Sequence, residues 1–203
     1  MKQWMTRLFC LGLAAVYIVF GAAIQTEAKE NQKEIAGQVL RLHIRANSDS
    51  VSDQQLKLQV REAVIDCLKT YRSEMRDIQS AKLTVAKHRA AIQGAARQAV
   101  QSANYEVNIT LGRSWFPEKR YGDVVLPEGM YDAVIVNIGQ AQGQNWWCVL
   151  FPQLCFIDMT HGYVSEEAKE ELGENLSEDA YDSLIDPSVE ARFKIVEWLQ
   201  NIW

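Results

Sequence analysis

The sequence lacks the short motifs that mark the common hydrolases and nucleotide-binding enzymes. It contains no HExxH, CxxC or GxSxG pattern and no Gly-rich phosphate-binding loop. It also lacks an excess of positive charge, because 21 Lys and Arg stand against 26 Asp and Glu, giving a formal net charge of -5. This balance argues against a nucleic-acid partner. No internal repeat or low-complexity linker divides the chain, so we expect one domain. Because the motifs above are absent, we expect no cofactor and no metal.

The N-terminus has the features of an export signal or a membrane anchor. Lys2 and Arg7 precede an apolar run from Leu8 to Ile24, and small residues suited to signal cleavage follow. The run is slightly longer than a usual signal core and just short of a comfortable span of roughly 20 residues, so both alternatives stay open. In either case the positive end stays in the cytoplasm and the rest is exported. We therefore expect a leader at residues 1–28 and one extracytoplasmic domain at residues 29–203.

Hydrophobic periodicity in the exported part predicts an α+β fold. Apolar positions recur at three and four residues after Ser52, and the period changes to two after Asn104. In chain order the predicted elements are a strand Val39–Ile44, a long helix after Ser52, a helix Ser80–Ser102, a strand Tyr105–Leu111, a hairpin of Tyr121–Leu126 with Met130–Ile138, a strand Asn145–Phe151 and a helix Pro187–Trp203. Met130–Ile138 is apolar on both faces, which is typical of a central strand. We expect a single-domain antiparallel sheet with helices packed on one face.

Polar residues crowd the junction between the first strand and the first helix. Ser52 with Gln55 three residues later predicts a capping box at the start of the helix. The cap leaves two Arg and a His unexplained, and they alternate with apolar residues, so they share one face of the strand. A solvated or helix-contacting polar face explains them better than a catalytic trio. We expect a partner-binding surface on this strand face and at the helix entry, formed by Arg41, His43, Arg45, Asn47 and Asp49.

The run NWWCVLFPQLCFID, from Asn145 to Asp158, is the most apolar part of the exported chain. Core packing is its simplest interpretation, and an exposed partner-binding patch is the alternative. Cys148 and Cys155 flank Pro152, so a disulfide across the bend and two buried free thiols both stay open. A triad of Cys155 with the nearby Asp158 and His161 is disfavoured, because triad residues usually converge from separate segments. Zinc ligation by the two Cys and this His fits no usual spacing.

Several long stretches of the sequence resemble the stage II sporulation protein R family of endospore-forming bacteria. Besides the signal region, they are HIRANSDSVSDQQLKLQVR, LPEGMYDAVIVNIG, NWWCVLFPQLCFID and RFKIVEWLQ. The resemblance implies a non-enzymatic signalling protein that is made in the forespore and exported into the space between the two membranes. There it would lead to activation of a membrane-embedded aspartic protease that cuts the sigma-E precursor. The family has no established catalytic residues to transfer to this chain.

Two classes of function therefore remain. In the favoured one, the domain acts as a ligand that shifts a membrane protease toward its active state, which requires differential affinity and no chemistry. The alternative is a cell-envelope hydrolase acting on peptidoglycan or peptide, with His43, Asp49 or His161 taking part.

Overall fold

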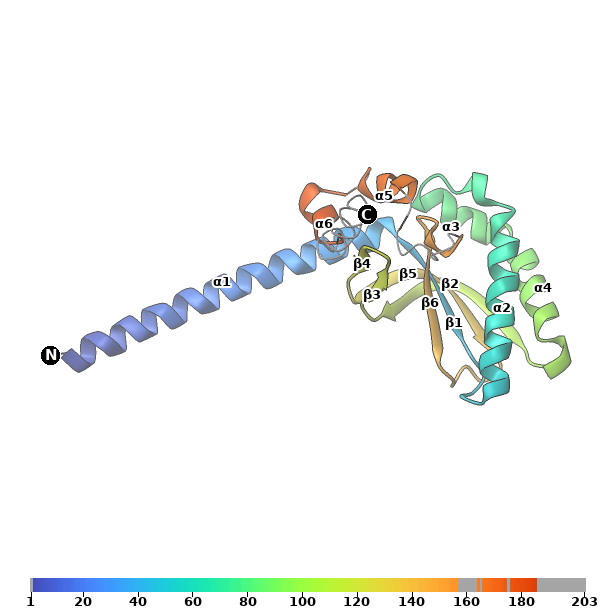
Figure 1. The fold of residues 1–203 in the computed structure, drawn as a ribbon, viewed down its shortest axis with the longest axis horizontal. Helices are drawn as coiled ribbons and strands as arrows, with labels where there is room; N and C mark the ends of the chain where they lie inside the picture. The colour runs from blue at the N-terminus through green and yellow to red at the C-terminus, as the bar shows by residue number, and fades with distance from the viewer. Residues whose placement is uncertain (1, 157–163, 165, 175, 186–203) are drawn as a thin grey trace, which may run out of the picture.

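The computed structural model describes residues 2–156, 164, 166–174 and 176–185 (Figure 1). Its main sheet has the strand order β2-β5-β1-β6, with strands Val107–Phe116 (β2), Gly129–Ile138 (β5), Leu40–Arg45 (β1) and Asn145–Phe151 (β6). β5 and β1 are parallel, and the two outer pairings are antiparallel. The parallel pair is possible because a long crossover, residues 46–128 with three α-helices and three strands, joins β1 to β5. The predicted single α+β domain is thus confirmed; its sheet, predicted to be antiparallel, is mostly so, with β1 and β5 as the parallel exception.

Three helices cover one face of this sheet: α2 (Val51–Lys69), α3 (Ile78–Lys87) and α4 (Arg89–Ala99) (Figure 1). β1 turns alternate side chains toward them, so Leu42 and Ile44 join the helical layer while the intervening polar residues face the other way. The apolar stripe of α2 that meets the sheet is fully buried and comprises Val60, Val64 and Leu68. This layer forms the main hydrophobic core.

A short two-stranded ribbon, β3 (Lys119–Tyr121) with β4 (Val124–Leu126), lies against the polar side of β1. The end of α1 (Lys2–Gln38) also packs on the domain, where Ile35 is fully buried. The Glu34 carboxylate accepts hydrogen bonds from the backbone N–H and the hydroxyl of Ser177. Ser177 caps α6 (Glu178–Asp182), which follows α5 (Glu166–Gly173).

The first part of α1 projects away from the domain in Figure 1. Across the described residues, no helix is both long and apolar enough to cross a membrane. The division into a leader at residues 1–28 and a domain after it stays a prediction.

The predicted hairpin between Tyr121–Leu126 and Met130–Ile138 is wrong. β4 pairs with β3, whereas β5 pairs with β2 and β1. The physical reason lies in β5 itself, which is ten residues long and buries apolar side chains on both faces. A ten-residue strand inside a sheet also carries a row of backbone N–H and C=O groups along each edge, and the three-residue β4 is too short to pair with most of one row. The prediction that this run is a central strand is confirmed.

The single helix predicted at Ser80–Ser102 is divided at His88 into α3 and α4. The imidazole stacks on Tyr71 with ring centroids 3.6 Å apart, and its Nε2 lies 3.1 Å from a carboxylate oxygen of Glu74. These contacts come from the segment before α3, so the sequence periodicity of the helix does not reveal them. The helix predicted at Pro187–Trp203 lies outside the described residues.

The predicted capping box at Ser52 and Gln55 is also wrong. Ser50 is the N-cap of α2, and its hydroxyl accepts a hydrogen bond from the backbone N–H of Asp53. The helix therefore begins two residues earlier than the sequence pattern indicated. The Asp53 carboxylate accepts hydrogen bonds from Ser48 and Asn47, which fix the preceding turn.

Candidate functional site

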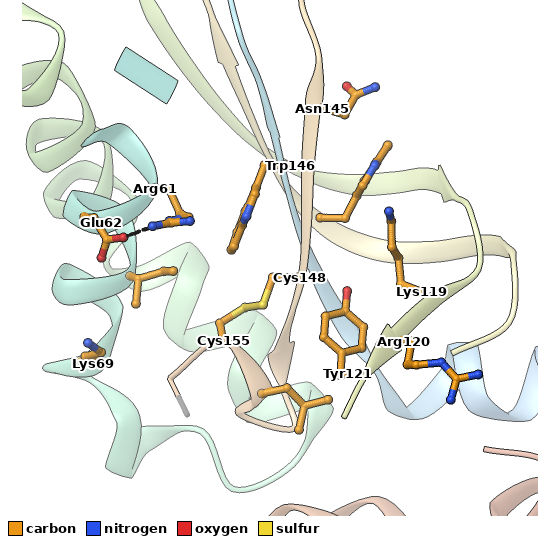
Figure 2. A pocket seen from close by; sticks show the side chains of 13 residues that line it. Arg61, Glu62, Lys69, Lys119, Arg120, Tyr121, Asn145, Trp146, Cys148 and Cys155 are labelled. Atoms are coloured by element: carbon orange, nitrogen blue, oxygen red, sulfur yellow. Dashed lines mark hydrogen bonds and ion pairs between the residues drawn. A yellow bond between two sulfur atoms is a disulfide. The ribbon is translucent and has the colours of Figure 1, made fainter. Parts of the chain in front are cut away.

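A cavity of about 740 Å³ opens along the outer edge of β6 (Figure 2). β6 is the last strand of the sheet, and among the described strands its only partner is β1. An edge strand turns its second row of backbone N–H and C=O groups outward. α2 forms one wall of the cavity and β3 forms the other, on the two sides of the strand (Figure 2). The charged residues that line it are Arg61, Glu62, Lys69, Lys119 and Arg120.

The aromatic segment that the sequence places at this edge is divided between core and surface. Phe151 is buried, whereas Trp146 and Trp147 are half-buried and line the cavity. The guanidinium carbon of Arg61 lies 5.4 Å from the Trp146 ring centroid. Part of the predicted apolar core is thus accessible from this cavity, which we call the β6 groove.

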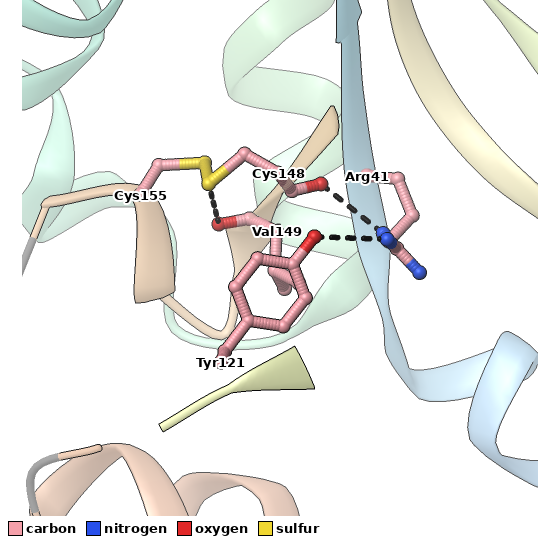
Figure 3. Close-up of a disulfide and its surroundings, with 5 residues drawn as sticks. All are labelled: Arg41, Tyr121, Cys148, Val149 and Cys155. Atoms are coloured by element: carbon pink, nitrogen blue, oxygen red, sulfur yellow. Dashed lines mark hydrogen bonds between the residues drawn. A yellow bond between two sulfur atoms is a disulfide. The ribbon is translucent and has the colours of Figure 1, made fainter. Parts of the chain in front are cut away.

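Cys148 and Cys155 form a disulfide at the end of β6 (Figure 3). Their Cα atoms are 5.8 Å apart, on either side of the turn at Pro152. The backbone carbonyl of Cys148 accepts a hydrogen bond of 3.1 Å from Nε of Arg41. The disulfide-bearing strand is therefore tied directly to the polar face of β1.

Arg41 is fully buried on the side of the sheet away from the helices, which corrects the prediction of a solvated or helix-contacting polar face. Its second hydrogen bond, from Nη2, goes to the hydroxyl of Tyr121 at 3.0 Å (Figure 3). The guanidinium carbon lies 4.3 Å from the ring centroid of Phe116 and 4.9 Å from that of Tyr131. Burial lowers the pKa of Arg41 from its usual value, and the surrounding phenols oppose this change. Arg41 thus holds β1, β2, β3 and β5 together and offers no surface to a partner in this conformation.

His43 is also buried, with 1% of its surface exposed, and its ring stacks on Trp147 at a centroid distance of 3.7 Å. Nδ1 lies 3.1 Å from the hydroxyl of Ser114, and Nε2 lies 2.9 Å from Oδ1 of Asn145. Ser114 was not identified from the sequence, because no motif surrounds it and 71 residues separate it from His43. The Ser-His-Asn arrangement borders a cavity of about 460 Å³ on the polar side of the sheet.

The electrostatics of this arrangement do not favour proton abstraction. Burial is the main reason why the pKa of His43 falls to about 4; the hydrogen bond with Asn145 opposes this change, and the positive charge of Arg45 contributes to it. The Arg45 Nε atom lies only 3.3 Å from Nε2 of the imidazole. A general base works best with a pKa near the operating pH, and the imidazolium that forms after it takes a proton would be opposed here by a neighbouring cation. Ser114 and His43 are thus of the residue types that serve as nucleophile and general base, but His43 would be a weak base.

Asn47 and Asp49 hold a loop together. The Asn47 side chain accepts a hydrogen bond of 3.0 Å from the backbone N–H of Gln140, and Asp49 accepts one of 2.7 Å from that of Gln144. The β5–β6 loop approaches so closely that a Cβ on Gly143 would lie 2.1 Å from the Ser48 carbonyl oxygen. These contacts give both residues a structural role, and a contact with a partner stays an untested prediction.

The remaining sequence hypotheses can be placed only in part. In the described portion of the chain, no group of three or more His, Cys, Asp or Glu residues is arranged to hold a metal ion. The two sulfurs that were considered, and disfavoured, as zinc ligands are joined to each other. Asp158 and His161 lie outside the described residues, so the disfavoured triad with Cys155 is not tested.

The family model for stage II sporulation protein R matches residues 36–161. The chain belongs to this family. It is also similar to stage II sporulation protein R of Bacillus subtilis strain 168, with 30% identity covering 90% of this chain and 91% of that protein. No solved structure matches the chain. The family match runs from the end of α1 past the end of β6, and so includes the whole sheet, α2–α4 and the β6 groove.

Proposed function

We propose that this protein is an intercellular signal of sporulation, exported from the forespore into the intermembrane space. There it leads to activation of a membrane-embedded aspartic protease, which cuts the inactive precursor of the sigma-E transcription factor. The protein acts as a ligand and carries out no chemistry, because stabilising the active state of the protease requires only tighter binding to that state. If the leader is not cleaved, the same domain acts while anchored to the membrane.

The extent of the family match carries this proposal. Residues 36–161 include all six strands that the structure describes, so the likeness extends over the described sheet and ribbon. Two further observations favour a ligand over an enzyme. His43, a residue of the hydrolase alternative, is buried, and its pKa of about 4 suits a general base poorly. The open edge of β6, in contrast, leaves a groove that no described strand fills.

Exchange of the leader tests the proposal in cells. Residues 1–28 would be replaced by an unrelated cleavable secretion signal in a sporulating strain that lacks the native gene, keeping Glu34 and Ile35, which pack on the domain. We expect normal cleavage of the sigma-E precursor on an immunoblot, and no cleavage from a variant without any leader. Cleavage by the leaderless variant would contradict an extracytoplasmic signal. Function restricted to the native leader would indicate a contact inside the membrane.

A second function, hydrolysis of peptidoglycan or peptide, is favoured by one observation, the contact of Ser114 with His43 and of His43 with Asn145. Ser114→Ala separates the two functions, with the exposed Ser102→Ala as a matched control. For a hydrolase, the Ser114 variant alone would lose the release of labelled fragments from purified cell walls. For a signal, it would retain precursor cleavage in proportion to its folded fraction, as the control does.

A further inference from the structure

We propose that the groove along β6 binds an extended acidic peptide segment, which adds to the open edge of the sheet as a fifth strand. The identity of the natural partner rests on the proposed function, whereas the binding itself is tested without the protease.

The geometry of the groove supports strand addition. α2 packs on one face of the sheet and β3 lies on the other, yet both line the same cavity. The groove therefore lies alongside the edge of β6, between a wall on each face of the sheet (Figure 2). A peptide lying there reaches the outward row of backbone groups of Asn145–Cys148, and it is flanked by a wall on each side. The cavity of about 740 Å³ provides room for several extended residues.

The charge of the groove opposes that of the whole chain. The protein has a formal charge of -5, but the groove is lined by four cationic residues and one carboxylate, Glu62. This carboxylate forms an ion pair with Arg61. Lys69 pairs with Asp66 at 3.0 Å, an exposed contact that an incoming acidic group can displace at small cost. The potential inside the groove therefore favours a negatively charged ligand.

The placement of the cations on both walls indicates which acidic residues fit. Arg61 and Lys69 come from α2, whereas Lys119 comes from β3; Arg120, the next residue of β3, points away from the groove (Figure 2). Successive side chains of a strand point to opposite faces, so an added strand presents one residue to each wall in turn. Consecutive acidic residues would each meet a cation. The half-buried ring of Trp146 offers apolar contact to β-branched residues of the peptide on either side of its acidic residues.

Fluorescence anisotropy with the full purified chain provides the test. The probe is a fluorescein-labelled peptide of about eight residues, with consecutive Glu and Asp in the centre and Val and Thr at both ends. We expect saturable binding that weakens about tenfold when the acids are replaced by Gln and Asn, and about tenfold in Lys119→Glu. Lys69→Glu is the second groove variant if Lys119→Glu fails to fold. Arg89→Glu, an exposed residue of α4 with the same change in charge, should leave affinity unchanged.

Methylation of the peptide backbone distinguishes a strand from a loosely held polyanion. Two further probes are methylated at every second backbone nitrogen, one at the odd-numbered residues and the other at the even-numbered residues. A peptide strand pairs through one set only, so one probe should lose binding and the other keep it. Equal binding of both methylated probes, equal binding of the acidic and amide peptides, or capture only by phosphatidylserine vesicles would overturn the proposal.

The test also separates the groove from the proposed function. If the protein does not bind the peptide but activates the protease, peptide binding in the groove is rejected and the signalling role is retained. A preparation that binds the peptide and never activates the protease supports the groove and rejects the signalling role.

Discussion

The guanidinium carbon of Arg41 lies 4.3 Å from the ring centroid of Phe116, inside the domain and away from solvent. This contact joins β1 to the end of β2, two strands that are separated in the sheet by β5. A charged residue thus serves as a packing element on the polar face, and its hydrogen bonds to Cys148 and Tyr121 extend the same network to β6 and β3.

Arg41→Lys should destabilise the domain by about 2–3 kcal/mol, because an ammonium group keeps the charge but cannot stack on Phe116 while donating to two acceptors. Arg45→Lys, at a half-buried position on the same face, is the control, with an expected change within about 0.5 kcal/mol. Urea unfolding measures both. An Arg41→Lys protein with wild-type stability and no signalling would show that the side chain contacts a partner.

Acid should weaken the fold through His43. Its pKa is about 4 in the folded protein against 6.5 for an unperturbed side chain. Between these two values the unfolded state binds more protons, so the free energy of unfolding falls as the pH drops from 6.5 toward 4. His43→Gln should remove this part of the pH dependence, measured as the difference between wild-type and variant urea midpoints across that range. A constant difference would indicate that His43 titrates normally in the folded protein.

The N-cap assignment predicts different costs for two neighbouring serines. Ser50→Ala removes the acceptor of the Asp53 backbone N–H and should cost about 1 kcal/mol. Ser52→Ala, at an exposed position in the first turn, should change stability by no more than about 0.5 kcal/mol. Thermal unfolding of both variants distinguishes them. Equal costs would return the cap to the position predicted from the sequence.

The disulfide predicts an effect of reduction on stability. Cys148 and Cys155 are separated by seven positions, and closing so short a loop is worth about 2.5 kcal/mol in the chain-entropy model. The Cys148→Ser and Cys155→Ser double variant should lose roughly that amount and become insensitive to dithiothreitol. Peptide mapping of wild-type protein that was expressed with a secretion signal should recover the two cysteines linked under non-reducing conditions. Two free thiols in such folded protein would contradict the bond.

The sequence predicted those parts of the fold that depend on local periodicity. The strand over Asn145–Phe151, the apolar stripe of α2 and the central position of β5 all follow from spacing within one segment. The false hairpin and the undivided helix arose where distant residues decide the outcome. β5 selects β1 and β2 over the neighbouring β4, and Tyr71 and Glu74 hold the break at His88.

The candidate site was harder to predict for the same reason. The alternation of polar and apolar residues correctly placed Arg41, His43 and Arg45 on one face of β1. Whether that face is buried depends on what covers it. The ring of Phe116, which covers Arg41, lies 75 positions further along the chain. Ser114 carries no motif and is brought to His43 by the sheet alone. The β6 groove is formed by segments around Arg61, Lys119 and Trp146, whose proximity no local pattern encodes.

Reconstitution tests the signalling role most directly. The purified exported protein would be added to vesicles containing the membrane-embedded protease, with its extracytoplasmic side outward and the sigma-E precursor enclosed, and cleavage followed over time. We predict that cleavage depends on added protein, saturates with its concentration and persists in Ser114→Ala. Absence of cleavage with folded protein and an intact protease, or the same rate without added protein, would contradict a ligand that switches the protease on.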